Sequence, residues 1–189
     1  DMVGLGSDSR TRGTEEVSDV DGTKKAITVT ITGANAVATI SGALTSTMWE
    51  DAATATGQAT ISDLVAGQSF STANSSIVVT YGHLPSDSVG NWTYTRDANM
   101  DSLASGSSAT DTVTVSGVDG TTQAITVTIT GANDVATIGG ALTSTMGEDA
   151  ATATGQATIS DLDAGQSRFT ANSSIVGTYG HLAIDSVGN

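Results

Sequence analysis

The stretch TDTVTVSGVDGTTQAITVTIT, residues 110–130, decides the fold of this chain. On both sides of Asp119-Gly120, threonine alternates with valine or isoleucine, so one face of each extended segment is apolar and the other carries hydroxyl groups. Such alternation is typical of a half-buried β-strand, and an Asp-Gly pair between two such runs indicates a β-hairpin. The pattern therefore predicts strands over 110–115 and 124–130, joined by a turn at 118–121.

The same pattern occurs earlier in the chain, at an offset of 98 residues. Residues 26–35 recur unchanged as 124–133. Over 14–91 aligned with 112–189, 64 of 78 positions are identical. This period exceeds the roughly 20–50 residues of solenoid repeats and matches a whole sandwich domain of immunoglobulin-like size. We therefore expect a tandem array of such domains.

Further short apolar segments stand between turns of Gly, Asn, Asp and Ser. They predict strands near 37–40, 54–61, 76–81 and 91–95. No segment stands out for helical periodicity. About seven strands in each 98-residue repeat indicate an all-β fold built as an antiparallel sandwich.

The charge balance argues against some functions. The 189 residues include 20 Asp+Glu and 6 Lys+Arg, which gives a formal net charge of -14. Because nucleic-acid binding relies on Lys and Arg to displace counterions, we expect no nucleic-acid partner. The chain has no Cys, which excludes thiolate sites, and no apolar run approaches the roughly 20 residues that span a bilayer, so we expect no membrane insertion.

No constellation of residues predicts an enzyme. The two histidines, His83 and His181, occupy equivalent positions in Tyr-Gly-His-Leu and are interpreted as solvent-side strand residues. A nucleophile elbow and a phosphate-binding loop with Lys are both missing from the sequence. We therefore expect a protein that is not an enzyme.

The run DGTTQAITVTITGAND, residues 119–134, resembles the end of the VCBS repeat, a bacterial cadherin-like or immunoglobulin-like module. Other elements of that family occur in its order, and together they cover nearly the whole chain: Glu148-Asp149, ATG at 153–155, SDLDAGQ at 160–166, GTYG at 177–180 and GNWTYT at 90–95. The resemblance implies tandem immunoglobulin/cadherin-like antiparallel β-sandwich repeats of 98 residues. It also implies an extracellular place on the bacterial cell surface, in a secreted adhesin whose repeats act as structural extenders or as a fibre shaft. The alternative is an adhesin module that binds a carbohydrate or a protein receptor.

Calcium at the joints between repeats is a further implication of the resemblance. Six residues are then expected to bind it at one joint: Asn133, Asp134, Glu148, Asp149, Asp161 and Asp163. A weaker equivalent joint would keep Asn35, Glu50, Asp51 and Asp63. It is expected to be weaker because Ala36 and Val65 stand where the other copy has Asp134 and Asp163. The competing interpretation is that these residues simply occupy turns and exposed strand ends.

The family also implies a phase for the repeat. Residues 1–35 would supply the last strands of a preceding repeat and a possible donor segment, 36–133 a complete sandwich, and 134–189 the first part of the next repeat. Because a half-sandwich exposes unpaired edges and apolar faces, we expect its partners to be adjacent repeats or neighbouring copies in a head-to-tail homopolymer formed by strand complementation. The alternative phase divides the chain into 1–98 and 99–189.

Overall fold

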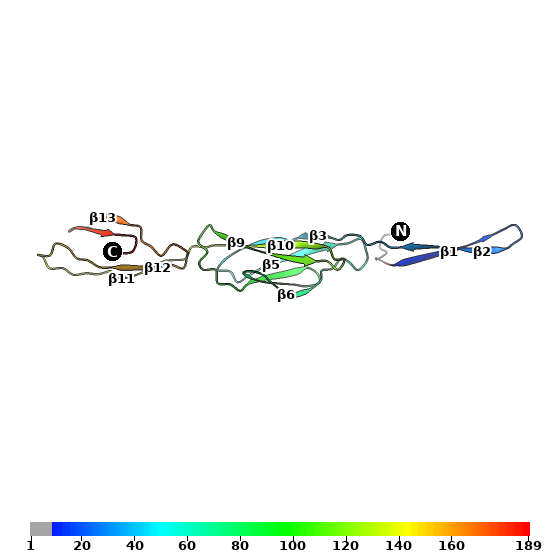
Figure 1. Cartoon of the computed structure of the whole chain (residues 1–189), viewed down its shortest axis with the longest axis horizontal. Coiled ribbons are helices and arrows are strands. Elements are labelled where there is room, and N and C mark those ends of the chain that lie inside the picture. The colour runs from blue at the N-terminus through cyan, green and yellow to red at the C-terminus, as the bar shows by residue number, and fades with distance from the viewer. Residues whose placement is uncertain (1–8) are drawn as a thin grey trace. The chain divides into compact units, whose positions relative to one another are not determined.

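The computed structural model describes residues 9–189, and that part of the chain is all-β, with fourteen strands and no helix (Figure 1). The strands are β1 (Arg10–Ser18), β2 (Lys24–Thr32), β3 (Thr39–Gly42), β4 (Thr45–Trp49), β5 (Thr54–Ser62), β6 (Asn74–Val78), β7 (Gly82–Ser86), β8 (Asn91–Arg96), β9 (Ser108–Ser116), β10 (Thr122–Thr130), β11 (Thr137–Gly140), β12 (Ala157–Ser160), β13 (Asn172–Val176) and β14 (His181–Ile184). Residues 1–8 of the expected N-terminal segment lie outside the described residues. Within 9–189, no helical segment offers the length and hydropathy required to traverse a bilayer.

The chain divides into two compact units. The first comprises Asp1–Ser46, Thr54–Asp97 and Asp111–Val127; the second comprises Thr47–Ala53, Ala98–Thr110 and Thr128–Asn189. The first unit holds the β1–β2 hairpin and a five-stranded antiparallel sheet in the order β3-β5-β8-β7-β6. The second unit holds two antiparallel pairs, β11–β12 and β13–β14.

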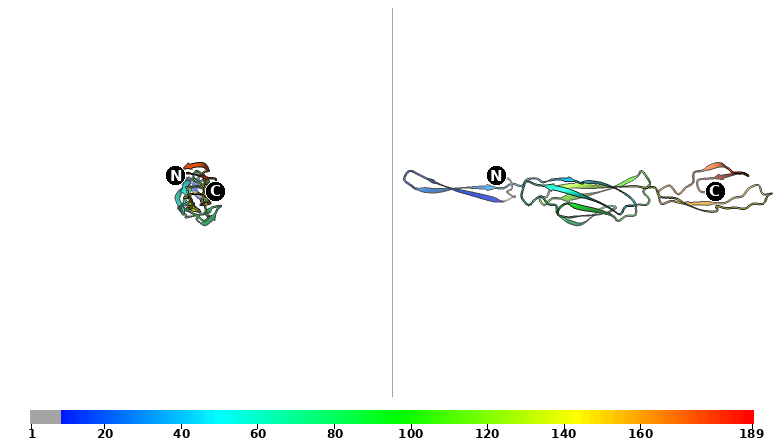
Figure 2. Two further views of the ribbon diagram at one scale, coloured as in Figure 1. Left: turned by 90° about the vertical axis from the view of Figure 1, so that its left-hand side faces the viewer. Right: turned by 180° about the vertical axis from the view of Figure 1, so that it is seen from behind.

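Three strands with residues in both units, β4, β10 and β9, form a further sheet in the order β4-β10-β9. Thr126 N donates to Leu44 O at 2.9 Å, and Glu50 N donates to Thr130 O at 3.0 Å. Residue numbers rise together along both strands, so β4 runs parallel to β10. We call strands β3–β10 the central sandwich; Figure 2 shows them from behind, in cyan to green.

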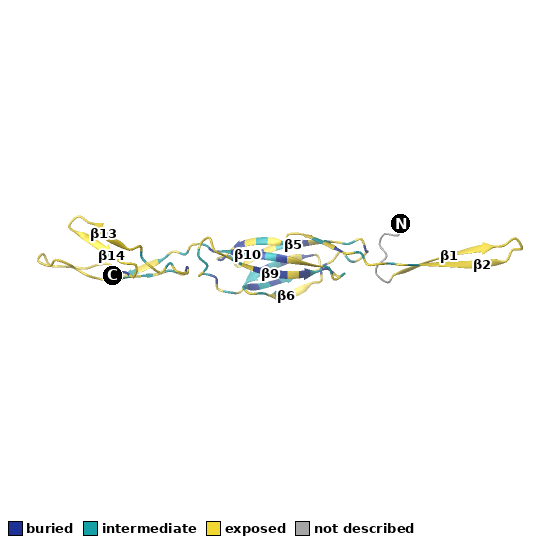
Figure 3. Ribbon diagram, turned by 45° about the horizontal axis from the view of Figure 1, so that its top comes forward, coloured by how far each residue is buried: buried dark blue, intermediate teal, exposed yellow. Residues whose placement is uncertain are grey.

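The core of the central sandwich follows the alternation in the sequence. Every second residue is buried over 111–115 of β9 and 125–129 of β10, including Val113, Val115, Ile125 and Val127, and Figure 3 shows these strands banded by burial. The facing sheet contributes the buried side chains of Leu84, Trp92 and Tyr94. The hairpin expected over residues 110–130 is therefore confirmed, as is the expected core strand at 91–95.

A buried carboxylate joins the two sheets of the sandwich. Asp111 on β9 accepts hydrogen bonds from Thr80 N at 3.1 Å, Tyr81 N at 2.9 Å and Tyr94 Oη at 2.8 Å. Burial, with the hydrogen bond and negative charge of Asp111, raises the pKa of Tyr94 well above its usual value. Tyr94 therefore stays protonated and able to donate in the folded chain.

The β1–β2 hairpin repeats this sequence pattern without burying it. Its strands pair in register from Arg10↔Thr32 to Ser18↔Lys24, but the side chain of Val29 is 57% exposed, whereas its counterpart Val127 is 1% exposed. The strands β11–β14 are also largely exposed, as the yellow ribbon of Figure 3 shows. An apolar strand face alone therefore does not decide burial here.

Candidate metal centre

Three carboxylates come together in the second unit. Glu50 directly follows β4, Asp134 follows β10, and Asp163 follows β12. Each offers one oxygen, and the three oxygens lie within 4.8 Å of one another. The ion pairs Lys24–Glu16 and His83–Asp97 lie elsewhere in the chain. The cluster therefore concentrates negative charge from three separate segments.

Backbone and side-chain donors orient two of these carboxylates. Glu50 Oε1 accepts from Ala132 N at 2.9 Å, while Asp163 Oδ2 accepts from Asp134 N at 3.1 Å and from Gln166 Nε2 at 3.0 Å. In each carboxylate the second oxygen, Glu50 Oε2 or Asp163 Oδ1, is buried and has no hydrogen-bond partner. The residues themselves are only 1% and 2% exposed. Such buried, unpaired carboxylate oxygens are costly unless something compensates their charge.

The pKa of the third carboxylate, Asp134, is raised by its surroundings. Burial raises the pKa of Asp134, and the negative charges of Asp163, Asp51, Asp101 and Asp161, in that order, raise it further. The arrangement favours either a proton or a bound cation. An all-oxygen set of carboxylates suits hard cations such as Ca²⁺, which takes six to eight oxygen ligands.

Local turns place Asp163 in the cluster. Asp161 Oδ1 accepts from Asp163 N at 2.9 Å, and Ser167 Oγ donates to Asp161 O at 3.1 Å. These two hydrogen bonds close the loop of residues 161–167. Gly165 has φ +80°, a left-handed conformation that a side chain disfavours. Ala164 N also donates to Ser102 O at 3.2 Å, which attaches this loop to residues 98–110.

A close backbone approach fixes the segment that carries Asp134. Gly131 N donates to Ser107 O at 3.0 Å, and a Cβ at Gly131 would lie 2.0 Å from Leu103 O and 2.3 Å from Ala104 O. Only glycine fits at this position without displacing the backbone. The next residue, Ala132, then presents its N–H to Glu50.

The structure brings together part of the set expected from the sequence. Asp134 and Asp163 lie in the cluster, and Asp161 supports Asp163. Asn133 is exposed and donates through Nδ2 to Asp134 O at 2.6 Å. The remaining two, Glu148 and Asp149, are exposed and are not among the three clustered carboxylates.

Glu50, which the sequence assigned to the weaker joint, supplies the third carboxylate instead. It does so because β4 lies beside β10 and ends where β10 ends, as the bond from Glu50 N to Thr130 O shows. Glu148 is the counterpart of Glu50 in the next repeat. In the sequence, Glu50 is visible only as a Glu at the end of a short segment. The pairing of that segment with β10, which brings Glu50 to Asp134 and Asp163, could not be predicted from residue spacing.

The equivalent earlier positions keep the turn but lack the carboxylates. Asp63 Oδ1 accepts from Val65 N at 2.7 Å, as Asp161 accepts from Asp163 N. Val65 is buried where the second copy has Asp163, and Ala36 replaces Asp134. Asn35 and Asp51 are exposed. Within the described residues, Glu50, Asp134 and Asp163 form the only group of three such side chains close enough to share a metal ion.

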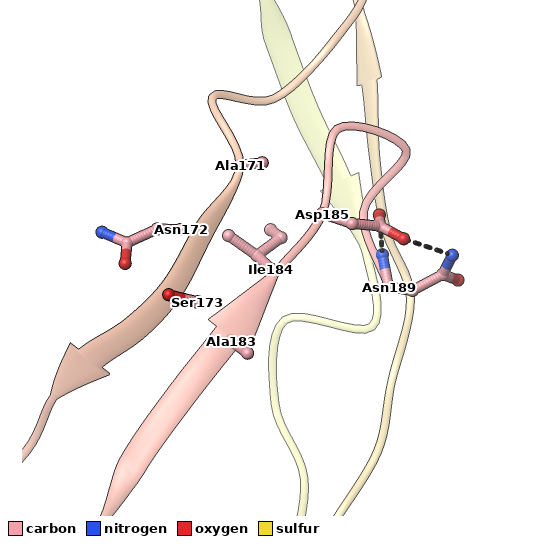
Figure 4. Close-up of a pocket in the computed structure, with 7 residues that line it drawn as sticks. All are labelled: Ala171, Asn172, Ser173, Ala183, Ile184, Asp185 and Asn189. Atoms are coloured by element: carbon pink, nitrogen blue, oxygen red, sulfur yellow. Dashed lines mark hydrogen bonds between the residues drawn. The ribbon is translucent and has the colours of Figure 1, made fainter.

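A pocket beside β13 and β14 offers little chemistry. Figure 4 shows Asp185 Oδ1 accepting from Asn189 N at 2.9 Å and Asp185 Oδ2 accepting from Asn189 Nδ2 at 3.0 Å. These bonds lower the pKa of Asp185 below its usual value, and its carboxylate therefore serves a turn. The other lining residues are Ala171, Asn172, Ser173, Ala183 and Ile184.

Comparison with known proteins adds no relative. No family model matches the chain, and a search of curated proteins finds no significant match.

Proposed function

We propose that the chain is a calcium-binding structural repeat, acting as an extender or fibre shaft rather than as an enzyme. The observation that carries the proposal is the pair of buried oxygens, Glu50 Oε2 and Asp163 Oδ1, that have no hydrogen-bond partner and belong to carboxylates clustered with that of Asp134. The other oxygen of each group is already held by an N–H donor. A cation would compensate charges that the fold otherwise leaves buried and unpaired.

The chemistry of the cluster favours calcium among the biological cations. All the candidate ligand atoms are oxygens, and Asp51, Asp101 and Asp161 are near enough to raise the pKa of Asp134. Water and backbone carbonyls can complete the six to eight oxygens that calcium takes, whereas Mg²⁺ is more often held by one or two carboxylates and several waters. A bound ion would link segments near residues 50, 134 and 163, which are far apart in the sequence.

The proposed setting rests on the sequence repeat. Its 98-residue period and its resemblance to the VCBS repeat support tandem immunoglobulin/cadherin-like modules of a secreted bacterial adhesin, located outside the cell. Sixty-four identities in 78 aligned positions favour a spacer over a receptor site, because a dedicated binding site is usually single.

Thermal unfolding in calcium and in a chelator tests the proposal. We expect the melting temperature to rise as calcium approaches about 10⁻⁴–10⁻³ M, the affinity range of extracellular modules. Glu50→Gln should abolish the rise, because it removes one of the three charges. Glu148→Gln is the matched control: it makes the same change at the equivalent, exposed residue and should leave the rise intact. An unchanged melting temperature for the unmodified chain would contradict calcium binding.

A further inference from the structure

We propose that the β1–β2 hairpin of one chain docks on the β11–β14 segment of a second copy, completing there the sandwich that β9 and β10 complete within each chain. The proposal deepens the proposed structural function by naming its partner. It rests on residues outside the metal centre, so either proposal can fail without the other.

The internal repeat identifies donor and acceptor. At the offset of 98 residues, β1 and β2 correspond to β9 and β10, while β11, β13 and β14 correspond to β3, β6 and β7. β12 corresponds to the second half of β5. In the central sandwich these equivalents pack on one another, so the chain itself contains the template for the proposed contact.

The donor face is apolar and uncovered. Ile27 and Val29 on β2 are 51% and 57% exposed, whereas their counterparts Ile125 and Val127 are 0% and 1% exposed. Among the described residues, β2 pairs with β1 alone, whereas β10 lies between β9 and β4. The hairpin therefore presents both a bare apolar face and a strand edge with unpaired backbone groups.

The acceptor is incomplete at the matching place. Residues 143–147, the counterpart of β4, form no strand, although their sequence differs from that of β4 only at Gly147. β4 is a strand where β10 lies beside it, through Thr126 N to Leu44 O. By equivalence, Thr28 N of one copy would donate to Leu142 O of the next.

The apolar side chains of the acceptor are exposed to a similar degree. Leu182 is 57% exposed, whereas its counterpart Leu84 on β7 is 0% exposed. Met146 is 54% exposed, and its counterpart Met48 on β4 is 6% exposed. Two faces whose counterparts pack on one another in the central sandwich are thus both exposed in the part of the chain that the structure describes.

Strand length favours a second copy over closure within one chain. Ala38 N donates to Asp119 Oδ2 at 2.9 Å, so the connection from β2 to β3 reaches the sandwich at the start of β10. The connection to β11 leaves from Thr130, at the other end of this nine-residue strand. The two points are about 30 Å apart at the rise of a β-strand. The hairpin and β11 are thus attached at opposite ends of β10, each through a connection of six residues, and this separation of the attachment points favours docking between copies.

Charge also distinguishes donor from acceptor. Four of the six Lys and Arg residues lie on the hairpin, Arg10, Arg12, Lys24 and Lys25, and they balance its four acidic residues, Glu15, Glu16, Asp19 and Asp21. Residues 134–189 contain six Asp and Glu against one Arg, a net charge of -5. The hairpin, with no net charge, can approach this acidic segment without net electrostatic repulsion, whereas two copies of the acidic segment would repel one another.

One donor residue departs from the template and provides a test. Glu15 stands where β9 has Val113, which is 2% exposed. A carboxylate at that inward position opposes docking. Glu15→Val should therefore strengthen association at least tenfold, while Glu16→Thr, which also installs the β9 residue but on the outward face, should change it much less.

Sedimentation velocity over a range of protein concentrations measures the association. The unmodified chain should form dimers and longer oligomers, since a head-to-tail contact leaves both ends open. Val29→Asp on the donor and Leu182→Asp on the acceptor should each weaken association at least tenfold, and both replace exposed side chains, so folding is retained. Thr30→Asp, on the opposite face of β2, is the matched control and should have little effect.

Mixing the two defective variants is decisive. The Val29→Asp chain keeps an intact acceptor and the Leu182→Asp chain keeps an intact donor, so an equimolar mixture should form one-to-one dimers and nothing longer. A mixture that stays monomeric overturns the proposal. It is equally overturned by an unmodified chain that remains monomeric up to about 1 mM, or by Thr30→Asp weakening association as much as Val29→Asp.

Discussion

The effect of Asp163→Val on the free energy of unfolding should have opposite signs in metal-free and in calcium-loaded protein. The repeat itself supplies the substitution, because Val65 occupies the equivalent position, is buried, and keeps the same turn. The variant therefore removes the buried carboxylate while retaining a side chain that the turn accepts.

The magnitude follows from the contacts of Asp163. The substitution removes two hydrogen bonds to Oδ2, from Asp134 N and Gln166 Nε2, each with a net contribution of about 1 kcal/mol. It also removes the unpaired Oδ1, whose burial costs about 1–3 kcal/mol, and adds apolar burial of about 1.5 kcal/mol or more. In a chelator we therefore expect the variant to be more stable than the unmodified chain by about 1 kcal/mol.

Calcium should invert this order. At a calcium concentration of 100 times the dissociation constant, binding stabilises the unmodified chain by about 2.7 kcal/mol, and the variant should gain none of it. Urea unfolding in chelator and in calcium gives both differences, and calorimetric titration gives the affinity. If the variant is destabilised equally in both conditions, Asp163 serves only the turn and the reasoning about the metal centre is refuted.

Three further predictions concern the sandwich. Asp111→Ala should destabilise the fold by about 3 kcal/mol in urea unfolding, because it leaves the N–H groups of Thr80 and Tyr81 and the hydroxyl of Tyr94 without their acceptor; a loss below about 0.5 kcal/mol would contradict this role. Because folding raises the pKa of Tyr94, the stability that this group contributes is complete below the unfolded pKa of about 10 and is lost as the pH rises above that value. Tyr94→Phe should therefore reduce the decline of unfolding free energy with alkaline pH by about 1.4 kcal/mol per pH unit. An unchanged decline between about pH 10 and 12 would argue against the raised pKa. Gly131→Ala should lower the melting temperature markedly because its Cβ would meet Leu103 O at 2.0 Å, whereas Gly147→Ala, with open space around it, should not; equal effects would contradict the close approach.

The alternation of apolar and polar residues was sufficient to predict the long strands. The hairpin at residues 110–130 was predicted because its apolar residues repeat with period two and flank an Asp-Gly turn, and this pattern directly reflects how a strand faces a core. The strands β4 and β7 were not predicted. β7 contains Gly82 and Pro85, residues that are depleted in strands, and the five-stranded sheet nevertheless holds it between β6 and β8.

The candidate metal centre could be predicted only in part. Asp134 and Asp163 were expected because the resemblance to the VCBS repeat implies that acidic clusters meet at a joint. Glu50 joins them because a parallel pairing brings the ends of β4 and β10 together, and no local pattern encodes that pairing. The burial of β2 was likewise not decided by its own residues, since its apolar face is identical to that of β10 but is exposed where that of β10 is covered.

The parallel pairing of β4 and β10 has a mechanical consequence. If the segment of residues 36–133 is pulled from its two ends, the strands near those ends are drawn in opposite directions along their common axis. The hydrogen bonds from Thr126 N to Leu44 O and from Glu50 N to Thr130 O are then perpendicular to the applied force and are loaded together in shear. They must break together, whereas a hairpin pulled from its open end separates one pair at a time. We expect single-molecule stretching to show a higher rupture force for this segment than for the β1–β2 hairpin, as the proposed extender function requires.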